Sequence, residues 1–377
     1  MNSDFEENYL PVRQASLRKI RILVAPLDWG LGHATRCIPV IYELLKQPCD
    51  VWIAAEGAQE TLLKQEFPEL PFLQLPGYRV KYSRSATGML WSIFRQTGKI
   101  FCAIRDEHAW LERMVDEHGF DAVIADNRYG LYHKSIPCIF ITHQLAIKSP
   151  LGKWSERLLR KRNYRYINRF TACWVPDEEG ENNLAGELSH PIQMPHIPVH
   201  YTGPLSRFKK TSTEEIKDHL LFILSGPEPQ RTILENKIIN DIAHYPGSAT
   251  IVRGLPDAAN LIPSTNSIKL YNHLPASELN EEINKAACII SRSGYSSVMD
   301  ITGLQKKSIL IPTPGQTEQE YLGRYLLQKQ LALCIPQQGF VLTSALQKAK
   351  NFSYRFTGLP AGDTLHTIIK QFIASLR

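Results

Sequence analysis

Residues 287–329 have the sequence ACIISRSGYSSVMDITGLQKKSILIPTPGQTEQEYLGRYLLQK, whose pattern is the clearest indication of the fold. It begins with an apolar run of strand length, Ala287–Ile290, followed by a turn at Gly294 and a helical pattern from about Tyr295. A second apolar run, Ser308–Ile311, leads through a polar loop into another helical pattern. Strands that alternate with helices in this way predict βαβ units, which build a parallel sheet.

The same alternation extends over the rest of the chain in two series. Runs that are apolar throughout are typical of strands buried on both faces of a parallel sheet. The first series is Ile20–Ala25, Asp50–Ala54, Phe72–Leu75, Ala122–Ala125, Pro137–Thr142 and Thr171–Val175. The second is Leu220–Leu224, Ala249–Val252, Ile268–Tyr271, Ala287–Ile290 and Ser308–Ile311. A chain of 377 residues is long enough for two such domains. The sequence therefore predicts an α/β protein with two Rossmann-like, doubly wound parallel-sheet domains that face a central cleft.

The expected boundary between the two domains lies in a proline-rich connection. Residues 186–210 include HPIQMPHIPVHYTGPL, which has no helical period. Proline density of this kind marks a connection between domains. We expect an N-terminal tail at 1–18, an N-terminal domain at 19–200, a hinge at 201–210, a C-terminal domain at 211–360 and a C-terminal helix at 361–377 that packs back on the N-terminal domain.

Composition places the protein in the cytoplasm. The chain contains no apolar run near the roughly 18–20 residues that span a bilayer. Its first residues are polar and acidic, whereas a signal peptide has a basic start and an apolar stretch. The seven cysteines are scattered and form no CxxC pair, so neither a zinc site nor a disulfide framework is indicated.

A glycine-containing turn follows the first apolar run, in the sequence PLDWGLGHATRC from residue 26. Gly30 and Gly32 permit a tight turn before a helix that starts near Ala34, and a strand, turn and helix N-terminus together form an anion-binding site. The positive end of the helix dipole disfavours the imidazolium form of His33, so His33 is a candidate proton acceptor. A tight βα turn with a surface histidine is the simpler interpretation of the same pattern.

The turn after Ile290 is a stronger candidate for a ligand site. Gly294 allows a close approach of the backbone, and Ser293, Ser296 and Ser297 can cap the helix or meet phosphate oxygens. Asp300 follows Ser296 by one helical turn on the same face, where a carboxylate can accept hydrogen bonds from a ribose diol. Ordinary capping is the alternative interpretation.

Three further polar loops follow predicted strand ends. The loop after Ser308–Ile311 carries the candidate sugar-hydroxyl ligands Gln316, Gln319 and Glu320. The loop after Leu220–Leu224 carries Ser225, Gly226 and Arg231, which are candidates for phosphate oxygens, although a simple turn explains them equally well. In the N-terminal half, Asp126, Asn127 and His143 follow strand ends that should face the cleft. Each of these last residues alone is more often structural.

Motifs that would indicate other chemistry are absent from the sequence. It contains no GxxxxGK[ST] loop, no GxGxxG after a strand, no HExxH and no DxD pair. We therefore expect no nucleoside-triphosphate P-loop, no dinucleotide site, no metal site and no cofactor; a nucleotide-sugar would be a substrate.

With these motifs in place, the sequence resembles the glycosyltransferase family 28-like enzymes, which include the lipid II N-acetylglucosaminyltransferase and the plastid galactolipid synthases. The resemblance covers most of the chain and is firmest at 287–325. It implies the GT-B fold, an inverting, metal-independent transfer from a UDP-sugar, and a nucleotide-sugar site in the C-terminal domain opposite an acceptor-side N-terminal domain.

The resemblance also assigns roles on the acceptor side of the cleft. DWGLGH is similar to the family's N-terminal glycine loop, so His33 matches the residue regarded as the general base in the galactolipid synthases. Asp28 matches an acid that precedes the same loop. Asp126 and His143 remain alternative bases.

On the donor side, YTGPLSR is similar to the family's TGNPVR hinge, so Arg207 matches an arginine that contacts the donor. SRSGYSSVMD is similar to SRSGALTVSE, so Asp300 matches a ribose-binding carboxylate. His273 and Leu274 fall where backbone groups recognise uracil. Gln319 matches the first glutamine of a sugar-binding pair, and Glu320 departs from the second, which leaves the donor sugar open.

Two other functions remain open from the residues. GLGHATRC also resembles the glycine loop of nucleotide-sugar hydrolases, particularly at Arg36 and Cys37, so a UDP-sugar hydrolase or epimerase on the same fold is one alternative. A non-catalytic nucleotide-sugar- or glycan-binding protein is the other.

All of the excess charge lies in residues 151–170. This segment has seven basic residues and one acid, so 36 basic and 36 acidic residues remain elsewhere in a chain of net charge +6. A solvated helix face and an anionic membrane surface explain the segment equally well. The candidate membrane or acceptor surface is formed by Lys153, Trp154, Arg157, Arg160, Lys161 and Arg165. No nucleic-acid-binding motif accompanies it.

Taken with the resemblance, these features predict a glycosyltransferase that moves a sugar from a UDP-sugar to a hydroxyl acceptor. We expect a lipid-linked or cell-envelope glycan as acceptor, and a cytoplasmic enzyme bound peripherally to the inner face of the plasma membrane.

Overall fold

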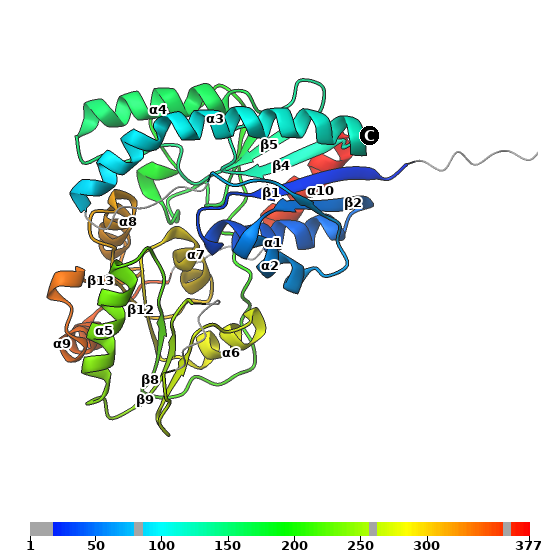
Figure 1. Cartoon of the computed structure of the whole chain (residues 1–377). Coiled ribbons are helices and arrows are strands. Elements are labelled where there is room, and N and C mark those ends of the chain that lie inside the picture. Colours follow the sequence, from blue (N-terminus) through cyan, green and yellow to red (C-terminus); the bar gives the residue numbers. More distant parts are fainter. Residues whose placement is uncertain (1–17, 79–85, 256–261, 357–362) are drawn as a thin grey trace, which may run out of the picture.

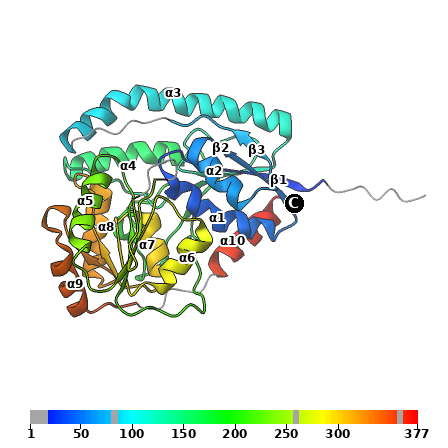
Figure 2. The same ribbon diagram turned by 60° about the horizontal axis from the view of Figure 1, so that its bottom comes forward.

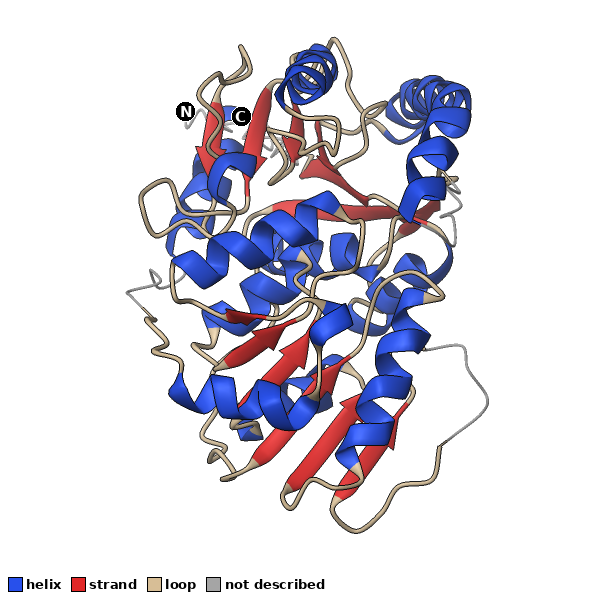
Figure 3. Cartoon of the chain, turned by 90° about the vertical axis from the view of Figure 1, so that its left-hand side faces the viewer, coloured by secondary structure: helices blue, strands red, loops and turns tan. Residues whose placement is uncertain are grey.

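The computed structural model describes residues 18–78, 86–255, 262–356 and 363–377 (Figure 1). Apart from Arg18, the expected N-terminal tail lies outside the described residues. The strands form two separate sheets, one in each half of the chain, with helices on their faces (Figure 3).

The first sheet has seven parallel strands in the order β3-β2-β1-β4-β5-β6-β7. Its strands are β1 (Ile20–Pro26), β2 (Cys49–Ala55), β3 (Phe72–Gln74), β4 (Ala122–Asp126), β5 (Cys138–Ile141), β6 (Ala172–Val175) and β7 (Val199–Tyr201). Its helices are α1 (Leu31–Leu45), α2 (Gly57–Glu66), α3 (Ala86–His118) and α4 (Lys153–Ile167), with a short 3₁₀ turn at Gly186–Leu188.

The second sheet has six parallel strands in the order β10-β9-β8-β11-β12-β13. Its strands are β8 (His219–Ile223), β9 (Ser248–Val252), β10 (Ile268–Tyr271), β11 (Cys288–Ser291), β12 (Ser308–Leu310) and β13 (Leu333–Cys334). Its helices are α5 (Gln230–Ile242), α6 (Ala276–Lys285), α7 (Tyr295–Gly303), α8 (Thr317–Gln328) and α9 (Leu342–Asn351), with a 3₁₀ turn at Gln337–Gly339.

Burial on both faces explains why the strands are apolar throughout. In β1, Ile22 and Val24 lie in one hydrophobic cluster, whereas Leu23 and Ala25 lie in another on the opposite face. Successive side chains of a strand point to opposite faces, so only a sheet covered by helices on both sides buries all four. The expected α/β architecture of two doubly wound parallel sheets is confirmed.

Two strands were not expected from the sequence. β7 lies in the proline-rich connection, and its three residues are exposed or half-buried, so they form no apolar run. β13 has only two residues, Leu333 and Cys334. Both strands lie at the edge of a sheet, where a strand pairs with a single neighbouring strand and need not be apolar at successive positions.

The C-terminal helix α10 (Asp363–Ser375) lies against the N-terminal half. Leu365, Ile369 and Ile373 are buried in the cluster that includes the inner face of α1. His366 Nδ1 lies 3.0 Å from Glu43 Oε2, and Phe372 meets Trp174 edge-on with ring centroids 5.5 Å apart. The chain therefore returns to the first sheet after completing the second. No described helix is long and apolar enough to cross a membrane.

Candidate active site between the two sheets

The turn that follows β1 meets the turn that follows β11. Gly30 has a φ of 80°, a conformation that favours glycine, and it begins α1. A Cβ on Gly32 would lie 2.7 Å from Ser296 Oγ, and Ser296 donates a hydrogen bond of 3.1 Å to the Gly32 carbonyl. The N-termini of α1 and α7 therefore face each other at close range (Figures 1 and 2). A larger residue at position 32 would force the Ser296 side chain to move.

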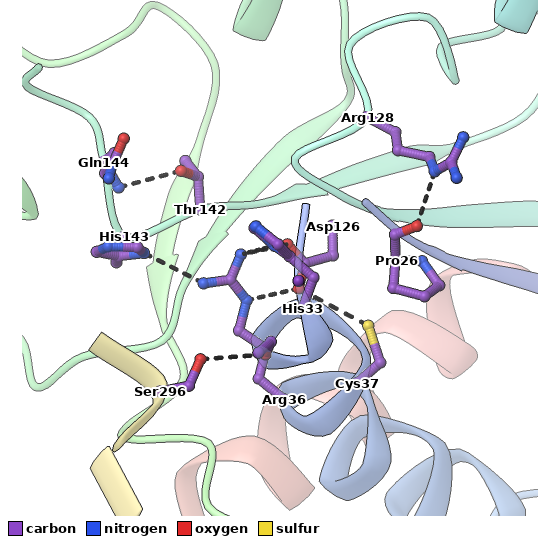
Figure 4. Close-up of polar contacts among 12 residues, drawn as sticks. Pro26, His33, Arg36, Cys37, Asp126, Arg128, Thr142, His143, Gln144 and Ser296 are labelled. Atoms are coloured by element: carbon purple, nitrogen blue, oxygen red, sulfur yellow. Dashed lines mark hydrogen bonds and ion pairs between the residues drawn. The ribbon is translucent and has the colours of Figure 1, made fainter. Parts of the chain in front are cut away.

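Asp126, at the end of β4, is the centre of a buried ion cluster (Figure 4). Its carboxylate accepts hydrogen bonds from Arg36 Nε at 2.5 Å and from Arg36 Nη2, and its Oδ1 lies 2.9 Å from His33 Nδ1. Burial alone would raise the pKa of Asp126, but the positive charge of Arg36 and the contact with His33 outweigh it and lower the pKa to about 2. Asp126 is therefore ionised, and its carboxylate orients the side chains of His33 and Arg36.

His143, just after β5, joins this cluster to the second half of the chain. Arg36 Nη1 lies 3.1 Å from His143 Nδ1, and a guanidinium can only donate, so Nδ1 accepts and the proton is on Nε2. That nitrogen lies 2.8 Å from Glu318 Oε1 of α8. Burial lowers the pKa of His143, which favours the neutral ring. The ring also stacks on Tyr295, with centroids 4.1 Å apart.

The four candidate bases are not equivalent in the structure. Asp126 is ion-paired, and both ring nitrogens of His143 are occupied. Asp28 accepts a hydrogen bond of 3.0 Å from the Tyr78 backbone, and its carboxylate lies beside Gly77, away from the cluster. The side chain of His33 is 16% exposed, and no described residue bonds to its Nε2. Only His33 presents an unoccupied ring nitrogen.

A buried cation without a carboxylate partner lies in the second half. The guanidinium of Arg292 donates only to the carbonyls of Gln230, Ile311 and Pro312, and its Nε has no partner among the described residues. Burial lowers the pKa of Arg292 to about 10, so it remains charged at neutral pH.

This nitrogen lies near Gly226 and the Thr313 hydroxyl. A Cβ on Gly226, whose φ is 103°, would lie 3.6 Å from Thr313 Oγ1 and 4.0 Å from Arg292 Nε. Thr313 Oγ1 is buried and also lacks a partner among the described residues. Buried charges and hydroxyls are normally paired, so an anion beside these two groups would supply the partner that each lacks. Gly226 itself lies in the loop before α5.

The loop around α7 and α8 is held by residues that were expected to contact a sugar. Gln319 Oε1 accepts a 2.9 Å hydrogen bond from the Thr313 backbone, and the Gln319 carbonyl accepts one of 2.8 Å from Ser293 Oγ. Glu320 Oε1 accepts one of 2.9 Å from the Gly315 backbone. Gln316 occupies the N-cap position of α8 without a side-chain cap hydrogen bond, and its Oε1 is buried with no partner in the described structure. Its side-chain oxygen is therefore available to a ligand.

Asp300, which lies on α7, interacts electrostatically with Arg207, and Arg207 also interacts with His273. Asp300 Oδ1 accepts a 2.7 Å hydrogen bond from Ser206, and burial raises the pKa of Asp300 to about 6, although Ser206 and Arg207 act in the opposite direction. Arg207 Nε is buried and unpartnered among the described atoms. Burial and then the charge of Arg207 lower the pKa of His273.

Several expected donor-site residues lie elsewhere or act differently. Arg231 is buried, with its guanidinium bonded to Glu228 at 2.6 Å and Glu235 at 2.9 Å, so we no longer assign it to a phosphate. The side chain of Leu274 is buried in the core, which leaves only its backbone for a ligand. Ser225 is exposed beside Gly226, and Ser297 is half-buried in the first turn of α7, where Gly294 precedes the helix.

Four residues of the site were not predicted: Arg36, Glu318, Arg292 and Thr313. Arg36 follows His33 by one helical turn and was noted only as part of a second resemblance, although this spacing places the two on one face. Glu318 and Arg292 bond to residues far along the chain, and the Thr313 hydroxyl has no partner in the described structure, so none of the three left a local signal. Among the described residues, no group of His, Cys, Asp and Glu could hold a metal ion.

Fold and site together define a protein of two parallel-sheet domains in which a histidine–carboxylate pair at the start of α1 lies close to the turn that precedes α7. Residues 264–354 match the glycosyltransferase family 28 C-terminal domain. The curated UDP-N-acetylglucosamine–N-acetylmuramyl-(pentapeptide) pyrophosphoryl-undecaprenol N-acetylglucosamine transferase of Haemophilus ducreyi is 22% identical, over 84% of this chain and 85% of its own length.

Solved glycosyltransferases share the whole fold. The spinosyn rhamnosyltransferase SpnG superposes with a TM-score of 0.63 at 15% identity, over 94% of this chain and 100% of its own. MurG of Acinetobacter baumannii superposes with a TM-score of 0.54 at 13% identity, over 95% and 96%. The GT-B fold and the resemblance to family 28 enzymes are confirmed, and the sequence similarities support a glycosyltransferase.

Proposed function

We propose that this protein moves a sugar from a UDP-sugar to a hydroxyl acceptor, with inversion at the anomeric carbon and without a metal ion. The observation that carries the proposal is the buried, uncompensated guanidinium of Arg292 beside Gly226 and Thr313. A diphosphate placed there would supply the missing negative charge. The Haemophilus ducreyi relative is named for a UDP-linked donor, which supports the choice of nucleotide.

The donor diphosphate lies, in this proposal, between Arg292 and the N-terminus of α7. Free backbone N–H groups and the helix dipole favour an anion at that end, after Gly294. A fixed cation and a helix N-terminus stabilise the charge that develops on the departing UDP. In other transferases a metal ion stabilises this charge. Asp300 accepts from the ribose hydroxyls, Arg207 contacts the donor, and the backbone at His273 and Leu274 recognises uracil.

His33 takes the proton of the acceptor hydroxyl. His33 Nδ1 lies 2.9 Å from both Asp126 Oδ1 and Arg36 Nη2. In this proposal Nδ1 carries the proton and donates it to Asp126, which leaves Nε2 as the acceptor, in the way that a buried carboxylate orients a catalytic imidazole. The acceptor oxygen bonds to the anomeric carbon as the bond from that carbon to the β-phosphate oxygen breaks. UDP departs with the bonding electrons, and the proton ends on His33.

The acceptor is proposed to be a lipid-linked or cell-envelope glycan, used at the inner membrane face by a cytoplasmic, peripherally bound enzyme. Support comes from the name of the Haemophilus ducreyi relative, which acts on a pyrophosphoryl-undecaprenol compound. The basic and apolar side chains of residues 151–170 would face the anionic membrane.

Thermal shifts with UDP, GDP and ADP, each with and without EDTA, test the donor site. We expect UDP to stabilise the protein most and EDTA to leave that shift unchanged. Stronger stabilisation by GDP, or loss of the UDP shift in EDTA, contradicts the proposal. Consumption of a UDP-sugar without any acceptor would instead indicate a hydrolase or epimerase, and binding without turnover would indicate a non-catalytic protein.

Thr313→Val tests the diphosphate position. Valine has nearly the shape of threonine, and the hydroxyl it removes has no partner in the described structure, so the fold should tolerate the change. Loss of a hydrogen bond to a charged group is worth roughly 1.5–3 kcal/mol, so the Kd for UDP should rise about tenfold or more. Calorimetry with UDP and uridine provides the control, because uridine affinity should stay constant. Equal weakening of both ligands would place the phosphates elsewhere.

A further inference from the structure

Glu318, the second residue of α8, reaches across the cleft to the first half of the chain. Its Oε1 lies 2.8 Å from His143 Nε2, and its Oε2 accepts a hydrogen bond from the side-chain amide of Gln144. Both carboxylate oxygens are thus bonded to residues that follow β5. Burial alone would raise the pKa of Glu318, but the hydrogen bond and charge of His143 outweigh it and lower the pKa, so the carboxylate is ionised at neutral pH.

The imidazole of His143 has little freedom to turn. One face stacks on the Tyr295 ring, with centroids 4.1 Å apart and an interplanar angle of 10°, and Tyr295 is fixed by a 2.7 Å hydrogen bond to the Pro176 carbonyl. Because Nε2–H points at Glu318, the lone pair of Nδ1 faces Arg36 Nη1 at 3.1 Å (Figure 4). A carboxylate behind an imidazole raises the basicity of the opposite nitrogen, so Glu318 strengthens the bond that His143 accepts from Arg36.

Arg36 extends this contact to the proposed base. Its Nε and Nη2 donate to Asp126, and Nη2 also lies 2.9 Å from His33 Nδ1. The guanidinium is planar and rigid, so a hydrogen bond at Nη1 fixes the direction of the other two nitrogens as well. Arg36 is buried, so water does not readily replace a bond that is lost at Nη1. A continuous chain of contacts thus runs from Glu318 to the pair formed by His33 and Asp126.

This chain of contacts begins in the loop expected to hold the donor sugar. Glu318 lies between Gln316 and Gln319, two of the candidate sugar ligands. α8 makes a second contact across the cleft about two helical turns later, where Tyr325 Oη donates a 2.6 Å hydrogen bond to Asn183 Oδ1. In the described structure Tyr325 bonds to none of the residues of the ion cluster. The two contacts therefore separate support of the base from simple docking of α8.

We propose that Glu318 is a positioning residue, which acts through His143 to hold Arg36 against the proposed base. The base is then fully assembled only when the donor loop is docked on the acceptor half of the cleft. The inference rests on the proposed function, because it gives Glu318 a role in a reaction that uses this base. Glu318 is not itself a catalytic residue, since it contacts none of the reacting atoms.

A double-mutant cycle tests whether Glu318 acts through His143. Glu318→Ala and His143→Phe are made singly and together; phenylalanine keeps a ring to stack on Tyr295 and lacks both nitrogens. UDP release is measured with the UDP-sugar that stabilises the wild-type protein most, and calorimetry gives the Kd for UDP. Outer partners of a metal-bound histidine are worth about 10- to 100-fold in activity, and each single variant should lose kcat in this range with the Kd for UDP unchanged. The double variant should lose no more than His143→Phe alone.

Nuclear magnetic resonance gives a readout that needs no turnover. In protein with ¹⁵N-labelled histidine, the ring signals of His33 are assigned by their loss in His33→Ala, and they should shift in Glu318→Ala. The shift should be absent when Glu318→Ala is added to His143→Phe. Tyr325→Phe is the matched control, because it removes a bond across the same cleft, and it should keep the wild-type rate and the wild-type His33 signals. Thermal melts establish that each variant is folded.

Four results would overturn the inference. Additive losses in the double variant would mean that Glu318 and His143 act separately, and an equal loss in Tyr325→Phe would mean that only docking of α8 matters. Unchanged His33 signals in Glu318→Ala would break the chain of contacts, and a raised Kd for UDP would make Glu318 a donor ligand. The proposed function fails differently. Wild-type protein that consumes no UDP-sugar contradicts that function, whereas Glu318→Ala at the wild-type rate contradicts only the inference.

Discussion

His33→Ala is expected to lower the rate of sugar transfer about 10²- to 10⁴-fold, the usual contribution of a general base, while the Kd for UDP stays within a few-fold. The physical reason is position. His33 lies at the start of α1 with Nδ1 at 2.9 Å from Asp126 and no described partner at Nε2, whereas the proposed diphosphate position is at Arg292 in the other half. Steady-state kinetics with saturating donor, together with calorimetry for UDP, measure the two quantities.

The matched control is His200→Ala, which removes an exposed histidine from the edge strand β7 of the same sheet and should leave the rate unchanged. If His33→Ala retains more than about a tenth of the wild-type rate, His33 is not the base. Asp28 would then be the next residue to replace, because it is not part of the Arg36 ion cluster.

Arg36→Ala should cause the largest loss of stability. It leaves the carboxylate of Asp126 buried without its cation, and breaking a buried pair in this way costs about 3–5 kcal/mol. For a domain of this size the melting temperature should fall by roughly 6–20 °C. Differential scanning calorimetry measures the shift. Because the pKa of Asp126 is lower in the folded than in the unfolded protein, its ionised carboxylate stabilises the fold. This stabilisation is fully present above the unfolded pKa near 4 and is lost as the pH falls toward 2.

Two further variants test whether the loss of stability comes from the unpaired carboxylate of Asp126. Lys46→Ala removes an exposed ion pair with Glu43 and should cost less than about 1 kcal/mol. Arg36→Met combined with Asp126→Asn removes both charges and should be less destabilised than Arg36→Met alone, because no bare carboxylate remains. A double variant that shows the full sum of the two single losses would mean that the pair is not coupled, and that Arg36 acts only through packing.

The contacts across the cleft explain why the site depends on both halves of the chain. Ser296 of α7 bonds to Gly32, and Glu318 of α8 bonds to His143. The residues that would hold the donor are therefore linked directly to the turn that carries His33. If a diphosphate binds near α7 as proposed, it would have to accommodate or displace the Ser296 contact, so we expect donor binding and the position of His33 to be coupled.

The sequence alone determined the fold and the location of the two facing turns. Strands buried on both faces must be apolar at successive positions, and this leaves a local, contiguous signal such as Ala122–Ala125. A turn that requires a positive φ or a close backbone approach requires glycine, so Gly30 and Gly32 were visible before any contact was known. Each of these two signals is contained within a few consecutive residues, so each can be recognised in the sequence without knowledge of tertiary contacts.

Which side chains at the site are paired and which are available depends on tertiary contacts between distant segments. The contact between His33 and Asp126 joins residues 93 apart in sequence, and that between His143 and Glu318 joins residues 175 apart, so no local pattern records either one. Arg231 appeared suited to a phosphate until packing placed it between Glu228 and Glu235, and Arg292 appeared ordinary until burial left it without a carboxylate. Burial and long-range pairing set the charge and the availability of a side chain, and both arise only when distant segments of the chain meet.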